Sequence, residues 1–395
     1  MRVLVAGGGP AGLAAASRLR GADAIVVEAM PRLGVPAHCT GIVSPWTARH
    51  LAGASIGRLE AEGLVEAYYR EALFLDGRLR ERCSVSARPL AVKLARPGLE
   101  DYLAGLAAAR GHRVATRSRL VAARPLPGGV EALVETPGGV ARIRASRLLV
   151  ATGAQRRSGA APQTGCLRAT GLEARLLLSR RIPDEVFVTI HGTPLAPGFF
   201  AWLAPVKGGR EAVVGLASSR PARLHRRLEA LLALLARRGL AEPSRVLGAR
   251  GGHILRGPPA PRAVHGRVGG LGDVLCASKP YTGGGLYAIA ALAAAAARWL
   301  EEGRGLEEEW RRLRRELVVQ HLLTRLAAAE PGLFLRLLSA ACGRAAEGSC
   351  GVDFDRHSSL AACLVPLRGL VPVRVQEKVL LDRLRNAEAD GADGA

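Results

Sequence analysis

Residues 1–29, MRVLVAGGGPAGLAAASRLRGADAIVVEA, are the stretch of this chain that decides its fold class. The apolar residues 3–6 are typical of a buried parallel strand, and the Ala-rich segment that follows predicts a helix. Between them, Gly7, Gly9 and Gly12 complete the pattern GxGxxG. The first glycine permits a tight turn, the second lets the backbone approach a pyrophosphate, and the third lets the helix pack closely on the strand. The stretch therefore predicts a phosphate-binding turn that leads into a helix.

A second strand is predicted over residues 24–27, and it ends in Glu28. An acidic side chain at this place accepts hydrogen bonds from the ribose of an adenosine. The pattern GxGxxG alone is a weak signal, but here strand, turn, helix, second strand and acidic residue occur in order. We interpret residues 1–29 as the start of a Rossmann-like dinucleotide-binding domain rather than as a glycine-rich turn.

A related arrangement recurs in GLGDVLCASKPYTGGGLYAIAAL, residues 270–292. We expect a strand over residues 269–276, a loop with three glycines and a helix over residues 286–300. Asp273 can hydrogen-bond the ribityl hydroxyls of a flavin, and the glycine turn lets backbone N–H groups approach the cofactor. FAD is too long for one phosphate site, so the two regions together predict FAD.

Further motifs give the chain a resemblance to a known family. They are Glu28 followed by Leu33-Gly34-x-Pro36-x-x-Cys39, then Arg96 before a predicted helix, then Phe200, Trp202 and Pro205, and finally Asp273, Pro280 and the glycines 283–285. With them the chain resembles the geranylgeranyl reductases, FAD enzymes of the para-hydroxybenzoate-hydroxylase-like class, and it looks closest to the archaeal digeranylgeranylglycerophospholipid reductases. The resemblance covers roughly residues 1–300. It departs from the related patterns at Thr40, often a glycine in the family, and at Thr152, an aspartate in the hydroxylases.

The resemblance implies an FAD-dependent reductase that saturates C=C bonds of geranylgeranyl chains on archaeal glycerophospholipid precursors. Its implied partners are an isoprenoid lipid substrate and an electron donor, NAD(P)H or ferredoxin, and no metal is expected. The implied cofactor-binding residues are Gly7, Gly9, Ala11, Gly12, Glu28, Cys39, Thr40, Ile42, Arg96, Leu120, Asp273, Gly285 and Leu286. The implied substrate-binding residues are Phe200, Trp202, Pro205 and Tyr281.

Cys39 is the candidate catalytic residue, because alkene reduction needs a proton as well as a hydride. The family motif places this thiol beside the flavin, and an ordinary thiol is protonated at neutral pH. The alternative is that Cys39 is a small buried apolar residue and that water or His38 donates the proton. Two other functions stay open: a flavin monooxygenase or halogenase of the same fold, and a non-catalytic prenyl-lipid-binding protein.

The predicted architecture is an α/β flavoprotein in several parts. We expect a discontinuous FAD-binding domain over residues 1–165 and 245–300, with a Rossmann-like core. An antiparallel-sheet substrate domain is expected over residues 166–244. A helical region over residues 301–385 and a disordered tail over residues 386–395 complete the chain.

The chain is strongly basic, with 56 Lys and Arg against 34 Asp and Glu among 395 residues, a formal net charge of +22. Two explanations are open: a genome-wide preference for arginine codons, and attraction to an anionic lipid surface. Nucleic acid is not expected as a partner, because an aromatic content of 4% does not supply a base-stacking platform.

The seven cysteines include no CxxC pair, which argues against a zinc ribbon. Whether Cys342 and Cys350 form a disulfide is not decided by the sequence. The first ten residues are needed for the strand and turn, so no signal peptide is expected. The longest apolar run, residues 286–297, is too short to span a bilayer. We expect a cytoplasmic protein, with peripheral contact at the inner face of the membrane left open.

Overall fold

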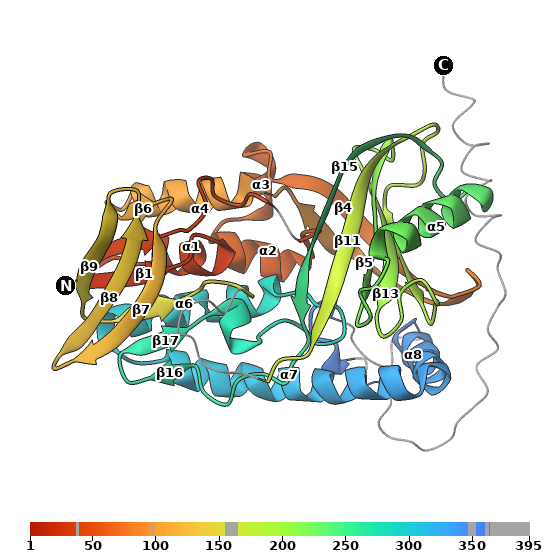
Figure 1. The fold of residues 1–395 in the computed structure, drawn as a ribbon. Helices are drawn as coiled ribbons and strands as arrows, with labels where there is room; N and C mark the ends of the chain where they lie inside the picture. The colour runs from red at the N-terminus through yellow and green to blue at the C-terminus, as the bar shows by residue number, and fades with distance from the viewer. Residues whose placement is uncertain (37–38, 97, 155–164, 347–352, 360–362, 364–395) are drawn as a thin grey trace. The chain divides into compact units, whose positions relative to one another are not determined.

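The computed structural model describes residues 1–36, 39–96, 98–154, 165–346, 353–359 and 363 (Figure 1). By its internal contacts the chain divides into two units. Unit 1 comprises Met1–Leu64, Leu94–Leu167 and Leu255–His321. Unit 2 comprises Val65–Lys93, Arg168–Ile254 and Leu322–Ala395.

A six-stranded sheet forms the centre of unit 1, in the order β16-β17-β10-β1-β2-β6. The strands are β1 (Arg2–Ala6), β2 (Asp23–Val27), β6 (Arg113–Ala115), β10 (Leu148–Val150), β16 (Val264–His265) and β17 (Val268–Gly270). All neighbouring pairs are parallel except β16 with β17. Residues 3–6 are fully buried, as a central parallel strand requires.

Helices and a small antiparallel sheet complete unit 1. The helices are α1 (Pro10–Ala16), α2 (Pro45–Ala52), α3 (Ile56–Ala61), α4 (Gly98–Ala108) and α6 (Leu286–Glu302), and a short strand β3 (Ile42–Val43) precedes α2. The three-stranded sheet is β7 (Arg119–Leu126), β8 (Gly129–Thr136) and β9 (Gly139–Ala145). Helix α7 (Leu306–Ala329) begins in unit 1 and continues into unit 2.

Unit 2 is built on long strands in the order β15-β11-β14-β13-β12-β4-β5. The strands are β4 (Val65–Asp76), β5 (Glu81–Leu94), β11 (Arg168–Leu178), β12 (Val186–His191), β13 (Phe200–Val206), β14 (Glu211–Ser218) and β15 (Pro243–Leu255). Helix α8 (Pro331–Ala346) also belongs to this unit.

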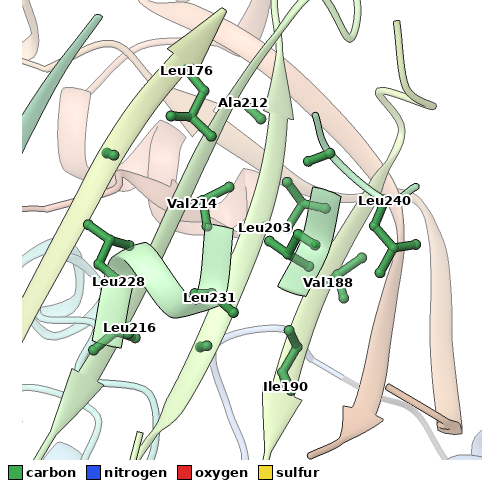
Figure 2. Close-up of a cluster of buried hydrophobic side chains, with 14 of the residues drawn as sticks. Leu176, Val188, Ile190, Leu203, Ala212, Val214, Leu216, Leu228, Leu231 and Leu240 are labelled. Atoms are coloured by element: carbon green, nitrogen blue, oxygen red, sulfur yellow. The ribbon is translucent and has the colours of Figure 1, made fainter. Parts of the chain in front are cut away.

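Helix α5 (Leu224–Arg237) covers one face of the unit 2 sheet (Figure 2). Its buried residues Leu224, Leu228, Leu231 and Leu235 recur at helical spacing and join a core cluster with alternate residues of the strands, such as Leu176 and Val214. On β11, Glu173 and Arg175 alternate with the residues of this cluster, so their side chains lie on the opposite face of the sheet. The two faces of this sheet therefore differ in character, one apolar and one rich in charge.

The mixed α/β architecture agrees with the prediction, but the boundaries of the two units differ from the predicted domain boundaries. Residues 65–93 and 245–254, predicted within the FAD-binding domain, lie in unit 2 because β4, β5 and β15 are strands of its sheet. The strand expected over residues 269–276 is short, because Gly272 adopts a φ of +76° and the 3-10 helix Gly272–Leu275 follows. Helices α7 and α8 fall within the predicted helical region. The predicted tail, residues 386–395, lies outside the described residues.

Candidate functional site

Four polar or glycine positions follow four neighbouring strands of the unit 1 sheet. Gly7 comes directly after β1 and Glu28 directly after β2, while Thr152 and Asp273 follow β10 and β17 within three residues. Because β2, β1, β10 and β17 are adjacent and parallel, their carboxyl ends share one edge of the sheet. Ligands of open α/β sheets bind at this edge. The candidate site is therefore assembled by the order of the strands.

The glycines of the first turn are required by their surroundings. Gly7 has a φ of +116°, and a Cβ built on it would lie 2.2 Å from the carbonyl oxygen of Ala151. A Cβ on Gly12 would lie 1.9 Å from the Gly7 oxygen, so only glycine lets the helix start this close to the strand. A Cβ on Gly9 would meet no described atom within 4 Å. Of the predicted glycines, Gly7 and Gly12 are thus explained by packing, and Gly9 leaves its backbone approachable.

The Glu28 carboxylate is held in place by two backbone groups. Its Oε2 accepts the N–H of Gly8 at 2.7 Å, and its Oε1 accepts the N–H of Met30 at 2.8 Å. Each carboxylate oxygen keeps a further lone pair for a ribose hydroxyl. The backbone of Glu28 also accepts the N–H of Ser118, two residues before Leu120, which is buried on β7. This contact brings the start of β7 to the end of β2.

The loop after β17 approaches helix α1 at Gly272, where an added Cβ would lie 3.2 Å from the Cβ of Ala11. Asp273 follows, and its Oδ1 lies 3.4 Å from the position of a Cβ on Gly285. The side chain of Asp273 keeps part of its surface accessible, while desolvation by burial raises the pKa of its carboxyl to about 6. Leu286 is buried at the start of α6. The structure thus brings Ala11, Asp273, Gly285 and Leu286 into one region of unit 1.

Arg96 connects the loop before β3 to helix α4. Its Nε donates to Oε2 of Glu100 at 2.7 Å, its Nη2 donates to Oε1, and it also hydrogen-bonds the free, half-buried thiol of Cys39. Burial acts to lower the pKa of Arg96, but the carboxylate of Glu100 outweighs it and the pKa is raised. The guanidinium is therefore a fixed cation. Thr40 and Ile42 continue the same loop into β3.

The buried polar atoms of unit 1 that have no hydrogen-bond partner among the described residues include Nη1 of Arg96, Oγ1 of Thr152 and Oγ1 of Thr282. Buried donors without a partner are costly, so such atoms point to a ligand that supplies acceptors. FAD carries phosphate, ribityl and ring acceptors, and these residues fit it. The sequence did not assign Thr152 or Thr282 to the site. Their position directly after a strand and inside the glycine loop is the signal that could have identified them.

The predicted substrate-binding residues Phe200, Trp202 and Pro205 all lie on β13 of unit 2. Phe200 stacks on Phe199 with centroids 4.6 Å apart and meets Trp202 edge-on at 6.0 Å. The indole Nε1 of Trp202 is buried with no partner among the described residues. Trp202 lies over Gly215, where an added Cβ would approach its ring to 2.4 Å. These contacts form an aromatic wall with one unused donor.

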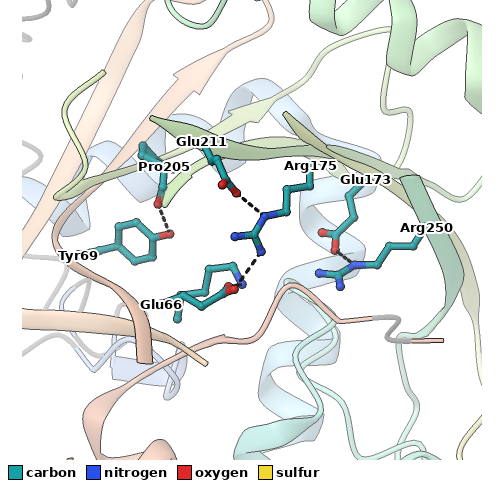
Figure 3. A network of polar contacts seen from close by, with 8 residues as sticks. Glu66, Tyr69, Glu173, Arg175, Pro205, Glu211 and Arg250 are labelled. Atoms are coloured by element: carbon teal, nitrogen blue, oxygen red, sulfur yellow. Dashed lines mark hydrogen bonds and ion pairs between the residues drawn. The ribbon is translucent and has the colours of Figure 1, made fainter. Parts of the chain in front are cut away.

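The remaining substrate candidates differ in their surroundings. The Pro205 carbonyl accepts the hydroxyl of the buried Tyr69 at 2.8 Å (Figure 3), so this backbone group is already used. Tyr281 lies in unit 1, in the loop of residues 279–285.

A set of paired charges occupies the face of the unit 2 sheet opposite α5 (Figure 3). Arg175 bridges Glu66 at 2.9 Å and Glu211 at 2.6 Å, Lys93 pairs with Glu66, and Arg250 pairs with Glu173 at 2.5 Å. Burial opposes the ionised form of Glu66, yet Lys93 and Arg175 lower its pKa. Each of these cations has a carboxylate partner, so we assign the network to the stability of the sheet.

The cysteine pairing differs from the one left open by the sequence. Cys166 and Cys276 of unit 1 form a disulfide across 110 residues of chain. Cys342 is a free thiol that hydrogen-bonds Cys83, so the Cys342–Cys350 pair is not formed, and Cys350 lies outside the described residues. Spacing along the sequence could not indicate a pairing set by the contact of distant loops.

Two kinds of site are absent from the described part of the chain. No helix there is both long and apolar enough to cross a bilayer. No group of three or more His, Cys, Asp or Glu side chains there could hold a metal ion.

Similarity to known proteins runs through most of the chain. No protein-family model matches it. A digeranylgeranylglycerophospholipid reductase of Methanospirillum hungatei is 25% identical over 309 residues, covering 72% of this chain and 72% of that protein. The crystal structure of a geranylgeranyl bacteriochlorophyll reductase-like protein from Thermoplasma acidophilum matches with a TM-score of 0.73 and 16% identity, covering 98% of each chain.

Other solved structures share the fold and carry other names. A p-nitrophenol 4-monooxygenase from Pseudomonas putida matches with a TM-score of 0.68 and 17% identity, covering 92% of this chain and 96% of that one. Klebsiella pneumoniae HpxO, solved with FAD and uric acid, matches with a TM-score of 0.65 and 19% identity, over 91% and 97% of the chains. A flavin-dependent brominase matches with a TM-score of 0.67 and 14% identity, over 98% of each. The predicted fold class is thus confirmed, and the HpxO structure among these neighbours contains FAD. The chain therefore shares the fold of these solved structures, and it is similar in sequence to a digeranylgeranylglycerophospholipid reductase.

Proposed function

We propose that this protein is an FAD-dependent reductase that saturates C=C bonds of geranylgeranyl chains on a glycerophospholipid precursor. The observation that carries the proposal is the shared strand edge of unit 1, which Gly7, Glu28, Thr152 and Asp273 follow. The buried hydroxyl of Thr152 has no hydrogen-bond partner there among the described residues. The likeness to a digeranylgeranylglycerophospholipid reductase supports the choice of substrate.

The residues of unit 1 bind and orient the cofactor in this proposal. Glu28 accepts hydrogen bonds from the adenosine ribose hydroxyls, and Asp273 accepts them from the ribityl hydroxyls. Gly9 has no side chain, so the pyrophosphate can approach the backbone there. When bound, FAD supplies the hydride for alkene reduction. Cys39 holds the proton that the second alkene carbon needs. A hydrogen bond from the guanidinium of Arg96 to its sulfur orients the side chain. The Glu100 carboxylate fixes Arg96 in turn.

The residues of unit 2 bind the apolar chain in this proposal. Phe200 and Trp202 present aromatic surface from β13, and burial of each CH₂ of an isoprenoid contributes ~0.8 kcal/mol. A long hydrocarbon therefore binds without many polar contacts. The electron donor is proposed to be NAD(P)H or ferredoxin.

A peripheral membrane contact is proposed for access to the lipid. Arg226 and Arg237 are exposed on α5, and the chain as a whole carries +22. If exposed arginines bind anionic lipid, vesicle binding should weaken strongly as salt rises, because exposed charges are screened within ~8–10 Å. Equal binding to neutral and anionic vesicles would favour the codon-preference explanation.

The rival function is a monooxygenase or halogenase, which the fold also supports through its neighbours. Mass spectrometry of lipids from a host that makes geranylgeranyl lipids and expresses this protein tests the reductase. We expect masses raised by about two units per saturated bond, absent from the host alone. The rival predicts unchanged lipids and oxygenation or halogenation of a small aromatic when the reduced holoprotein meets air, with halide supplied for the halogenase.

A further inference from the structure

Two free cysteines of unit 2, Cys83 and Cys342, contact each other. Cys83 lies on β5 and Cys342 on α8, and their side chains share a hydrogen bond. Cys342 is 2% exposed, whereas Cys83 is half-buried. The structure thus pairs a partly accessible thiol with an enclosed one.

The contact between the two thiols is fixed by the packing of α8 against β5. The carbonyl of Arg82, one residue before Cys83, accepts the hydroxyl of Ser339 at 3.1 Å. Ser339 lies about one helical turn before Cys342, so both residues face the strand. Both thiols also belong to one apolar cluster with Val85, which shares the strand face of Cys83. Independent contacts on either side therefore hold the pair in place.

Two thiols in contact can be joined by oxidation. An S–S bond joins sulfur atoms about 2 Å apart, so thiols in hydrogen-bond contact need only a small movement to bond. The alternative is a pair of inert apolar side chains, as structural buried cysteines are. The partial exposure of Cys83 favours reaction, because a small oxidant can reach its sulfur while Cys342 lies next to it.

We propose that Cys83 and Cys342 are a modification site at which a low-molecular-weight disulfide oxidises the pair and links α8 to β5. In the first step the sulfur of Cys83 attacks the small disulfide, forms a mixed disulfide and releases one small thiol. In the second step the sulfur of Cys342 attacks that of Cys83, forms the protein disulfide and releases the second small thiol. The protein loses two electrons and two protons, and the small disulfide gains them as two thiols. The site uses no residue of the proposed FAD site.

The surroundings of Cys83 make the first step slow at neutral pH. The pKa of its thiol is raised, chiefly by the hydrogen bond with Cys342 and then by burial and by the Glu81 carboxylate. The attacking species is the thiolate, so the reaction is best followed at about pH 8.5.

The test treats the full-length protein with oxidised glutathione at about pH 8.5 and maps its peptides by mass spectrometry without a reductant. We expect a peptide pair joined through Cys83 and Cys342, lighter by about two mass units than the two thiol peptides together. Cys39→Ser removes another half-buried free thiol and should give the same linked pair. Absence of the linked pair from the wild type would overturn the inference.

Single substitutions separate the two steps. Cys342→Ser should stop at the mixed disulfide and keep glutathione on Cys83. Cys83→Ser should leave Cys342 unmodified, because its sulfur is enclosed. Glutathione on Cys342 in Cys83→Ser would contradict the order of attack and overturn the assignment of Cys83 as the accessible thiol. If a serine variant does not fold, the alanine variant of the same residue gives the same readout.

Discussion

The backbone N–H of Gly8 donates a hydrogen bond of 2.7 Å to Oε2 of Glu28, joining the glycine turn after β1 to the acidic end of β2. This bond fixes the carboxylate next to the expected position of the adenosine. A Cβ on Gly8 would lie 2.8 Å from the Cβ of Glu28, so the close approach depends on glycine. The acidic residue and the turn are therefore held together, as the proposed ribose-binding and phosphate-binding element requires.

Glu28→Ala should weaken FAD binding about 10- to 100-fold, because a hydrogen bond to a charged group contributes about 1.5–3 kcal/mol. Fluorescence titration of the apoprotein with FAD measures the dissociation constant. Glu60→Ala removes an exposed carboxylate of the same unit and should leave it unchanged. Wild-type affinity in Glu28→Ala would show that Glu28 does not contact the ribose.

The disulfide Cys166–Cys276 should stabilise unit 1 substantially. It closes a loop of 110 residues, for which the chain-entropy estimate is about 4–5 kcal/mol. Denaturant unfolding with and without a reductant measures the effect. Reductant should lower the free energy of unfolding of the wild type by clearly more than that of the Cys166→Ser/Cys276→Ser variant, which keeps the disulfide of Cys363. Equal sensitivity of both proteins would assign the effect to other cysteines.

Asp273 should make the stability of the apoprotein depend on pH. Its pKa is raised to about 6 by burial, so the folded state takes up a proton more readily than the unfolded state. The stabilisation of the folded state by this preferential proton binding is fully present below about pH 4 and is lost as pH rises through 6. Asp273→Asn should therefore be more stable than the wild type at pH 8, by up to about 3 kcal/mol, with the difference vanishing near pH 4. Thermal unfolding across this range is the measurement, and a constant difference would contradict the burial of the charge.

The parts of this molecule that could be predicted from sequence are those in which local residues decide local structure. The strand, turn and helix of residues 2–16 follow from adjacent residues, and the ion pair of Arg96 with Glu100 is visible as an i, i+4 spacing. Strand β4 was assigned to the FAD-binding domain because its pairing with β12 cannot be seen in the sequence: it joins segments more than a hundred residues apart, Ala72 with Phe187 for example. The disulfide and the unpartnered Thr152 hydroxyl likewise arise from long-range contacts.

Cys39→Ser tests the proposed proton donor. The serine keeps the size of the side chain but is a much weaker acid, and general acid catalysis is typically worth 10²–10⁴-fold. We therefore expect double-bond saturation to slow by a factor in that range, with FAD affinity and flavin reduction largely intact, because the hydrogen bond from Arg96 can be made to the hydroxyl. Single-turnover saturation of a geranylgeranyl lipid by the reduced holoprotein measures the rate.

Two comparisons make this result decisive. Cys83→Ser changes another free thiol, in unit 2, and should leave the rate of saturation close to that of the wild type. If Cys39→Ser loses FAD while turnover per bound flavin is kept, the thiol only packs against the ring. Wild-type saturation in Cys39→Ser would rule out the proton-donor role and assign it to water or to His38, which lies outside the described residues. A loss confined to turnover would leave the thiol, oriented by Arg96 and Glu100, as the acid of the reaction.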